Sequence, residues 1–343
     1  MFNPIDRAEV EFTKVSEIGQ DGQNSKTFTA RDHQLDADIV IKEIVKASLV
    51  SPAEYFAESK ALYASSHPNV VQLHYACQNA DSIFIAMPFY ANGSVKPLIS
   101  GGSHLTIRRV VTLACQTLSA LHNIHSKGLI HFDVKPDNIL LSDRGDALLS
   151  DFGLAKQMTG GVAHPGKAYS KMIPPEALRG QPAFDLRWDI YQIGLTLYRM
   201  TVGNAEFDRQ FAAYAGDPNA FRADVLTERF PDRKRFPPHA PSRLRKVIKK
   251  CLKADPAERY QSAIEAANAL ALVDGPELDW VLTEAGGART WEKNEGGTKI
   301  VLDVGGDGVA RCVKQKGAGK ALRVAAMCRK VTESEISKFL GET

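Results

Sequence analysis

One stretch of the chain, HFDVKPDNILLS at residues 131–142, followed by DFG at 151–153, constrains the fold more than any other feature. Within about twenty residues it supplies a candidate base, a cation, an amide oxygen and a second carboxylate: Asp133, Lys135, Asn138 and Asp151. Together these groups suit a magnesium-bound triphosphate and a hydroxyl nucleophile held in line. The stretch therefore predicts phosphoryl transfer, on a fold that brings these side chains together.

The composition is that of an ordinary globular protein, with 44% apolar and 24% charged residues. The 343 residues exceed the size at which one core usually stops growing, so we expect two or three structural units. The formal net charge of +3 is close to neutral for this length and gives no reason to expect a nucleic-acid or membrane partner. No stretch approaches the roughly 18 uncharged apolar residues that a membrane span needs.

The N-terminus and the cysteine content indicate a cytoplasmic protein. The opening MFNPIDRAEVEF has acids and a proline where a secretory signal has an apolar block. The cysteines are odd in number and widely spaced, which indicates a reducing compartment and argues against a disulfide framework or a zinc site. They are Cys77, Cys115, Cys251, Cys312 and Cys328.

The chain up to about residue 90 is predicted to be rich in strands, with one helix. Ser51 as N-cap, Pro52 in the first turn and an early acid at Glu54 predict a helix that runs to about Ser65. Short β-branched runs predict the strands, with a turn at Asp36. The expected strands are 26–30, 38–44, 70–77 and 82–87.

From Thr106 onward the apolar residues recur at helical spacing. The first such stripe consists of Ile107, Val110, Val111, Ala114, Leu118, Leu121 and Ile124. Further helices are expected at about 185–201, 242–253 and 261–272, and two short strands flank the loop at 131–138. The pattern predicts a two-lobed α+β fold with a ligand between the lobes. We place the small lobe at about 10–89, the hinge at 87–91 and the large lobe at about 92–273.

The sequence pattern changes again after Val273, where Asp274-Gly275-Pro276 predicts a turn between two structural units. Strand-like runs follow at 298–304, 309–313 and 321–328, and a helix is expected near 333–340. We therefore expect residues 275–343 to form a separate small β-rich module.

The motifs quoted above resemble those of the protein kinase superfamily, over roughly residues 12–272, and the compact bacterial Ser/Thr kinases above all. The resemblance implies that Asp133 accepts or orients the proton of the substrate hydroxyl and that Lys135 neutralises the transferring phosphate. It also implies ATP as the donor, with Mg²⁺ (or Mn²⁺) held by Asn138 and Asp151. The Lys-Pro pair after Asp133 is typical of Ser/Thr kinases.

Lys42 ends the run Ile-Val-Ile-Lys, which resembles the third-strand motif of kinases. The resemblance implies that its ammonium contacts the α- and β-phosphates and is held by a helix carboxylate. Glu58 is the expected partner, with Glu54 one turn earlier as the rival; an exposed surface pair is the simpler alternative.

The glycine loop and the hinge complete the expected nucleotide site. The loop departs from the family pattern, because one extra residue separates Gly19 from Gly22 and Ser25 stands at the third glycine position. The residues implied to contact the nucleotide are Gly19, Gly22, Thr27, Val40, Lys42, Met87, Pro88, Tyr90 and Leu140. Pro88 lacks an amide proton, but its carbonyl and the amide of Tyr90 remain available to adenine.

Several residues match structural anchors of the family rather than its chemistry. Glu176 in Pro-Pro-Glu resembles the acid of a buried ion pair with Arg259. Asp189 resembles the aspartate that braces the catalytic loop. An apolar column that joins the lobes is implied for Leu62, Leu73, His131 and Phe152.

Phe132 occupies the position where many kinases have an arginine that binds a phosphorylated activation segment. An apolar ring cannot bind phosphate, so we hypothesise a kinase that the usual phosphate contact does not switch on. The segment 154–173 still offers sites for autophosphorylation, namely Thr159, Tyr169 and Ser170.

The stretch 311–330 is basic and contains no acid: Arg311, Lys314, Lys316, Lys320, Arg323, Arg329 and Lys330. A surface for nucleic acid or a phosphorylated ligand is one interpretation. The favoured interpretation is the solvent-exposed face of a small sheet, because the tail as a whole is balanced in charge. Trp280 and Trp291 are expected to dock the tail on the preceding lobe rather than to bind a ligand.

The sequence thus predicts an ATP- and magnesium-dependent Ser/Thr protein kinase with a C-terminal regulatory or targeting module. Its expected partner is a protein with a Ser or Thr hydroxyl, without membrane or nucleic acid. Two alternatives stay open. One is a pseudokinase scaffold that binds nucleotide, which the altered glycine loop favours. The other is a kinase-fold enzyme that phosphorylates small molecules.

Overall fold

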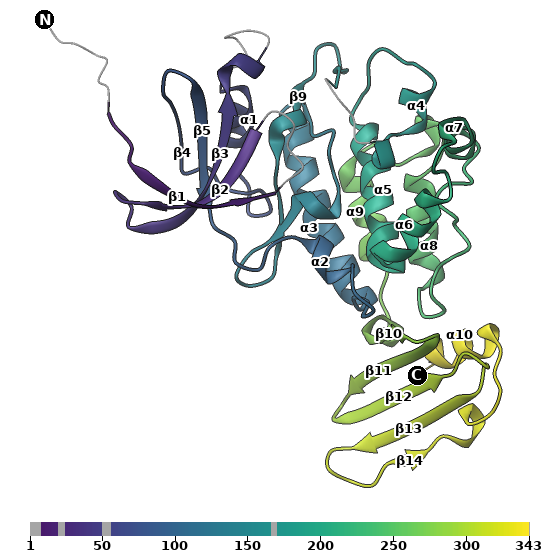
Figure 1. Cartoon of the computed structure of the whole chain (residues 1–343). Helices are drawn as coiled ribbons and strands as arrows, with labels where there is room; N and C mark the ends of the chain where they lie inside the picture. The colour runs from purple at the N-terminus through teal and green to yellow at the C-terminus, as the bar shows by residue number, and fades with distance from the viewer. Residues whose placement is uncertain (1–7, 20–24, 50–55, 166–169, 343) are drawn as a thin grey trace, which may run out of the picture.

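A five-stranded antiparallel sheet forms the first lobe of the computed structural model, which describes residues 8–19, 25–49, 56–165 and 170–342 (Figure 1). The strand order is β1-β2-β3-β5-β4. Ile39 and Ile41 point from the middle strand into a small core with Ala30, Phe84 and Ala86. The strands are β1 (Phe12–Ile18), β2 (Ser25–Asp32), β3 (Ala37–Val45), β4 (Tyr75–Gln78) and β5 (Ser82–Pro88). The predicted turn at Asp36 is confirmed, with φ of +50°.

Two predictions for this lobe were wrong in their bounds. The helix α1 covers Ala57–Ala64, and Phe56 before it has φ of +60°, so this helix does not extend back through Phe56. The predicted start and Glu54 lie outside the described residues. The strand predicted at 70–77 is reduced to β4, because Val70 makes only an isolated bridge to Leu149 in the other lobe.

The large lobe is helical, and the predicted helices are confirmed with small shifts. Thr106 caps α3 (Ile107–Ser126) by accepting a hydrogen bond from the Arg109 amide. The other predicted helices are α5 (Arg187–Val202), α8 (Ser242–Cys251) and α9 (Ala263–Ala271). Shorter helices that were not predicted are α2 (Val95–Leu98), α4 (Pro175–Leu178), α6 (Asn204–Ala212) and α7 (Pro218–Leu226).

Helix α5 is the centre of this lobe, since every residue from Trp188 to Val202 is buried. Gly194 lets it approach α8, because a Cβ at this position would lie 2.6 Å from Cβ of Cys251. Three of its buried polar residues, Asp189, Gln192 and Thr196, bond to the backbone of a neighbouring loop. The loop at 131–138 receives them, between the predicted short strands β6 (Leu129–Ile130) and β7 (Ile139–Leu141).

The C-terminal module contains a second five-stranded antiparallel sheet, β10 to β14 in chain order, with its own core around Trp280, Trp291 and Leu302 (Figure 1). Its strands are β10 (Val281–Ala285), β11 (Ala288–Glu295), β12 (Thr298–Val304), β13 (Ala310–Lys316) and β14 (Leu322–Arg323). The strand predicted at 321–328 was wrong beyond β14, because Ala325–Met327 forms a 3-10 turn that inserts Met327 into the core. The closing helix is confirmed as α10 (Glu333–Glu342).

The helices in the described part of the chain are too short or too polar to cross a bilayer.

Candidate active site

Asp133 lies at the centre of the loop between β6 and β7 and is almost fully buried. Its Oδ2 accepts hydrogen bonds from Asn138 Nδ2 at 2.8 Å and faces Lys135 Nζ at 2.9 Å. Its Oδ1 is also buried, yet it accepts no hydrogen bond from any described residue. A buried carboxylate oxygen without a donor is costly, so it indicates a place where a donor outside this chain binds.

Helix α5 fixes the backbone of this loop. Asp189 accepts hydrogen bonds from the amides of His131 and Phe132 at 2.8 and 2.9 Å. Gln192 accepts from the Val134 amide at 2.9 Å and donates to the Phe132 carbonyl at 2.9 Å. These hydrogen bonds from a charged and a neutral side chain satisfy buried backbone groups that lie outside any helix or sheet.

Gln192 is a positioning residue that the sequence interpretation missed, together with Thr196, whose hydroxyl donates to the Val134 carbonyl at 3.2 Å. The signal was present in the sequence. Asp189, Gln192 and Thr196 are spaced by three and four residues, so they share one face of an otherwise apolar helix.

Three charged side chains from different elements meet on the sheet side of the loop. Lys42 Nζ on β3 lies 2.6 Å from Glu58 Oε1 on α1 and 2.8 Å from Asp151 Oδ1, which follows β8 (Ala147–Leu149). Gly153 permits this approach, because a Cβ there would lie 3.1 Å from Lys42 Nζ. The side chains of Lys42 and Glu58 are only 11% and 12% exposed, which excludes an ordinary surface pair.

Burial opposes the charge on Lys42, but the carboxylates of Asp151 and Glu58 outweigh it and raise the pKa of the ammonium. The charge of Lys42 in turn lowers the pKa of Asp151, against the effect of burial. Burial raises the pKa of Glu58. At neutral pH the cluster therefore holds a fixed ammonium beside an ionised Asp151.

Asn138 and Asp151 are the two oxygen donors expected to hold a divalent cation. Ser150 links them, because its amide and hydroxyl donate to the Asn138 carbonyl at 2.9 and 3.0 Å. Asn138 commits its Nδ2 to Asp133, so its side-chain oxygen is the atom left for a metal. The described residues contain no group of three or more His, Cys, Asp and Glu side chains that could hold a metal. The donor set fits Mg²⁺, which takes one or two protein oxygens and completes its shell with phosphate and water.

Comparison with known proteins identifies the family. The family described as "Protein kinase domain" matches residues 12–270. The chain belongs to the protein kinase family. The Ser/Thr kinase PknJ of Mycobacterium bovis is 34% identical over 276 residues, which cover 77% of this chain and 46% of that protein. The Ser/Thr kinase pkn3 of Myxococcus xanthus is 31% identical over 264 residues, 72% of this chain and 47% of that protein.

A third relative, the Ser/Thr kinase PrkC of Bacillus subtilis, is 26% identical over 249 residues, which cover 71% of this chain and 37% of that protein. The alignments thus span less than half the length of these relatives.

The residues expected to surround the kinase nucleotide come from adjacent strands. Val40 on β3 faces Met87 on β5 in register, and Thr27 on β2 faces Lys42. Pro88 ends β5, Tyr90 follows and is half-buried, and Leu140 lies in β7. Gly19 has φ of +72° and open space around its Cα, whereas Gly22 lies outside the described residues.

The structural anchors of the kinase fold are in place. Arg259 and Glu176 form the predicted buried ion pair, with Nη1–Oε1 and Nη2–Oε2 distances of 2.8 and 2.5 Å. The rings of His131 and Phe152 meet edge to face, 5.0 Å apart. Leu62 shares their lobe-joining cluster, and Leu73 packs against it.

Phe132 is fully buried, in place of the arginine of many kinases. Its ring lies 5.2 Å from that of Trp188. Both rings belong to a hydrophobic cluster with Ala163 and Phe184, and Met158 packs against this cluster. The Phe132 φ of +66° is unfavourable for a bulky L-residue, and the two hydrogen bonds from α5 hold it there. Ala163 belongs to the activation segment, so this segment is attached to the catalytic loop by apolar contact.

Proposed function

We propose that this chain is an ATP-dependent Ser/Thr protein kinase. The observation that carries the proposal is Asp133, which has one oxygen held by Lys135 and Asn138 and the other buried without a donor. A substrate hydroxyl would supply that donor. The relatives named above are Ser/Thr protein kinases, which supports the same reaction and protein substrates.

The proposed roles follow from the chemistry of each group. Asp133 accepts or orients the hydroxyl proton, and Lys135 neutralises charge on the transferring phosphoryl group. Lys42 contacts the α- and β-phosphates while Glu58 holds it. Asn138 and Asp151 would bind Mg²⁺, or Mn²⁺ in its place, and the ion would neutralise the phosphate oxygens.

The proposed nucleotide contacts are Gly19, Gly22, Thr27, Val40, Met87, Pro88, Tyr90 and Leu140. Backbone amides near Gly19 can approach phosphates because glycine carries no side chain. Adenine would take the Pro88 carbonyl and the Tyr90 amide.

We also propose that this kinase does not need phosphate on its activation segment. Phe132 offers no cation for a phosphate, and the cluster of Phe132, Trp188, Ala163 and Phe184 supplies the attachment instead. Autophosphorylation would then occur without switching the enzyme on. Thr159 is exposed in a turn and Ser170 begins a 3-10 helix, whereas Tyr169 lies outside the described residues.

The two alternatives make different predictions. A pseudokinase scaffold would bind nucleotide without transfer, but the assembled Lys42, Glu58 and Asp151 cluster speaks against it. A small-molecule phosphotransferase would ignore protein acceptors, and the anchors Glu176, Asp189 and Arg259 favour a protein substrate.

The test is phosphate transfer from labelled ATP, with magnesium, to the protein itself and to a generic basic protein. Wild type is compared with Asp133→Ala and Lys42→Ala, and Asp143→Ala serves as the control because it changes an exposed carboxylate on a neighbouring turn. We expect transfer by wild type and by the control only. Thermal stabilisation by nucleotide without transfer to any acceptor would contradict the proposal and support the scaffold.

The C-terminal module is proposed to regulate the kinase through its docked position. The loop before α3 joins the module sheet, because the His104 amide donates to Leu282 at 2.8 Å and the Glu284 amide donates to Gly102 at 2.7 Å. Arg108 on α3 binds Asp279 through Nε and Nη2 at 2.6 and 2.8 Å. The module is therefore attached to the segment 95–108, which runs from α2 into the first turn of α3.

The same segment also reaches the catalytic loop. Lys96 on α2 lies 2.6 Å from Asp137, one residue before Asn138. At the other end of the segment, His104 packs against Gly203, since a Cβ there would lie 3.1 Å from its ring. A displaced module would thus disturb a segment that contacts the catalytic loop.

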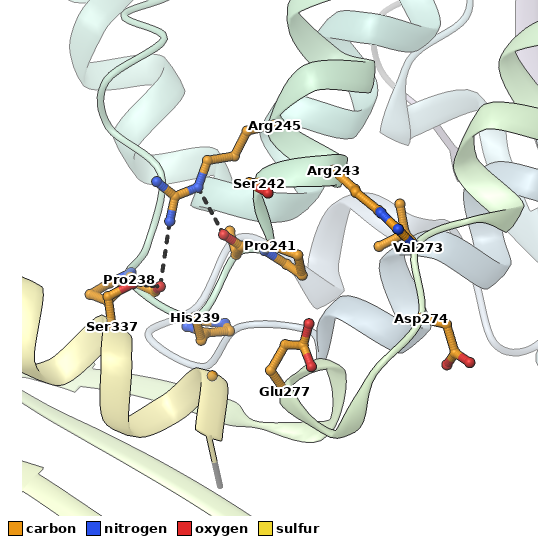
Figure 2. A pocket seen from close by; sticks show the side chains of 12 residues that line it. Pro238, His239, Pro241, Ser242, Arg243, Arg245, Val273, Asp274, Glu277 and Ser337 are labelled. Atoms are coloured by element: carbon orange, nitrogen blue, oxygen red, sulfur yellow. Dashed lines mark hydrogen bonds between the residues drawn. The ribbon is translucent and has the colours of Figure 1, made fainter.

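Of the two tryptophans predicted to dock the module, Trp291 contacts the large lobe. Trp291 Nε1 donates to His239 Nδ1 of the large lobe at 3.0 Å, whereas Trp280 Nε1 donates to Leu340 within the module. His239 borders a cavity of about 420 Å³ at this junction, shown in Figure 2, which Arg243, Asp274 and other residues line. The cavity carries both basic and acidic side chains, so it favours neither anion nor cation.

The regulatory proposal is tested with the full chain. Arg108→Gln removes the contact to Asp279, and Arg144→Gln changes an exposed arginine of the same lobe as the control. We expect a changed rate of phosphate transfer for Arg108→Gln alone, with nucleotide affinity preserved. An unchanged rate, also after deletion of 275–343, would overturn regulation by the module.

A further inference from the structure

Two cysteines of the module lie against each other. Cys312 is on β13, and Cys328 follows the 3-10 turn at 325–327. The Cys312 amide donates to Cys328 Sγ at 3.4 Å, and the Cys328 thiol donates to the Cys312 carbonyl oxygen at 3.5 Å. The Val324 amide donates to that same carbonyl at 2.9 Å, so residues 324–328 curl around Cys312. Both thiols are free.

The surroundings of Cys328 favour a thiolate. The hydrogen bond from the Cys312 amide lowers the pKa of the Cys328 thiol most, and burial opposes it. The smaller effects of Arg323 and Arg311 lower the pKa further. The basic stretch 311–330, which the proposed kinase reaction does not use, supplies these charges without an acid in the same stretch. Among the acidic groups nearby, Asp303 faces Arg311 in register across the sheet, and Glu335 pairs with Arg329 beside Cys328.

The other cysteines differ from Cys328 in this respect. Cys77 and Cys115 are also half-buried, but burial raises the pKa of each thiol. Cys251 is fully buried, and burial raises its pKa to about 12. Cys312 is fully buried in the module core, and burial and the neighbouring Cys328 raise its pKa to about 11. Cys328 alone among them combines partial exposure with a site that stabilises negative charge.

We propose that Cys328 and Cys312 form a peroxide-sensitive dithiol, with Cys328 as the reacting residue and Cys312 as the resolving residue. The Cys328 thiolate attacks a peroxide oxygen, the O–O bond breaks, and hydroxide leaves to give Cys328 sulfenic acid. The Cys312 sulfur then attacks the Cys328 sulfur, the S–O bond breaks, and the hydroxyl leaves as water with the Cys312 proton. In sum, two thiols and hydrogen peroxide give one disulfide and two waters, and a dithiol reductant reverses the step.

The disulfide would cross-link β13 to the chain just before α10. Backbone contacts already hold this region, since the Ala310 amide donates to the Arg329 carbonyl at 2.8 Å. A bond between neighbours that are already in contact closes a loop without a large movement. We therefore expect oxidation to stabilise the module rather than to unfold it.

The first test measures alkylation of the reduced full chain by iodoacetamide at pH 7, followed by peptide mass spectrometry. Cys77 and Cys115 are internal controls, since they are half-buried like Cys328. We expect Cys328 to react about tenfold faster than either, as expected for a site with a larger thiolate fraction. Equal rates at the three cysteines would overturn the proposal.

The second test adds one equivalent of hydrogen peroxide to the reduced full chain. A Cys312–Cys328 cross-linked peptide that a dithiol reverses is the expected result. Cys312→Ala should stop at Cys328 sulfenic acid, which dimedone traps, and Cys328→Ser should give no cross-link. Oxidation at Cys77 or Cys115 instead, or Cys328 oxidised without any link to Cys312, would contradict the dithiol.

Discussion

Phe132 makes a packing contact at the position where, by our proposal, other kinases make a regulatory one. Its ring is fully buried against Trp188, in a cluster that also contains Ala163 of the activation segment. An arginine in the same place would need a phosphate as partner, because a buried unpaired cation is costly. We therefore propose that the substitution changes both what holds the activation segment and when it is held.

Phe132→Ala tests this role by removing the ring from the cluster. We expect the free energy of unfolding to fall by about 3–5 kcal/mol, as for other buried phenylalanines, and transfer activity to fall because the activation segment loses its attachment. Urea denaturation measures the first effect. Leu272→Ala is the control, since this side chain is 65% exposed and its removal should change stability little. Equal losses in the two variants would contradict the packing role.

At the scale of elements, the catalytic loop has the shape that α5 imposes on it. Gln192→Leu removes the acceptor of the Val134 amide and the donor to the Phe132 carbonyl. The unpaired amide should cost about 1–3 kcal/mol of stability, and the rate of phosphate transfer should fall with it. Thr201→Val on the same helix is the matched control, because the Thr201 hydroxyl bonds only to Leu197 of that helix. A full rate in Gln192→Leu would show that α5 does not position the loop.

Helix α10 begins with a capping box, in which Thr332 and Glu335 exchange hydrogen bonds. The hydrogen bond from Arg329, followed by those from Thr332, lowers the pKa of Glu335 to about 2. Because the carboxyl pKa is lower in the folded chain, ionised Glu335 contributes its full stabilisation when the pH is above the ordinary glutamate pKa. This contribution disappears as the pH falls through about 2. The stability difference between wild type and Glu335→Gln should follow that course in acid titrations. A difference that does not vary with pH would contradict the lowered pKa of Glu335.

Part of the fold was predictable because local signals agreed with tertiary structure. The stripe of α3 and its Thr106 cap are examples, and so is the catalytic loop with its motif spacing. Phe56 shows why boundaries failed, since a left-handed residue without glycine or asparagine gives no local signal. Strand β11 was missed because Lys293 points inward beside Trp280, which breaks the apolar alternation.

The site was more predictable than the supports around it. Lys42, Asp133 and Asp151 come from motifs whose order is visible in the chain. The structure brings Lys42 together with Glu58 and Asp151, and it places Lys135 beside Asp133. The contribution of Gln192 depends on which face of α5 meets the loop, and that follows only from packing.

At the scale of the whole molecule, the protonation of His239 depends on the docking of the module on the large lobe. Burial, and then the charges of His104 and Arg245, lower its pKa to about 3, and the neutral ring accepts the Trp291 hydrogen bond. The unfolded chain binds a proton below the ordinary histidine pKa of about 6.5, whereas the folded chain does not. The free energy of unfolding should therefore fall as the pH drops from about 6.5 toward 3, by about 1.4 kcal/mol per pH unit for this group.

His239→Gln should flatten that slope between pH 7 and pH 5 relative to wild type. Denaturation at each pH gives the comparison, and His33→Gln, at a residue near the surface of the small lobe, is the control. An identical slope in wild type and His239→Gln would show that the ring is not held neutral at this interface.

The central claim is that the kinase is assembled without phosphate on its activation segment. The most direct measurement is the initial rate of transfer from ATP by enzyme that a phosphatase has freed of phosphate, with its phosphorylation state checked by mass spectrometry. The rate should be linear from the first time point and equal to that of the autophosphorylated enzyme, with Asp133→Asn as the inactive reference. A lag that disappears after autophosphorylation, or activity in the phosphorylated form alone, would contradict the claim.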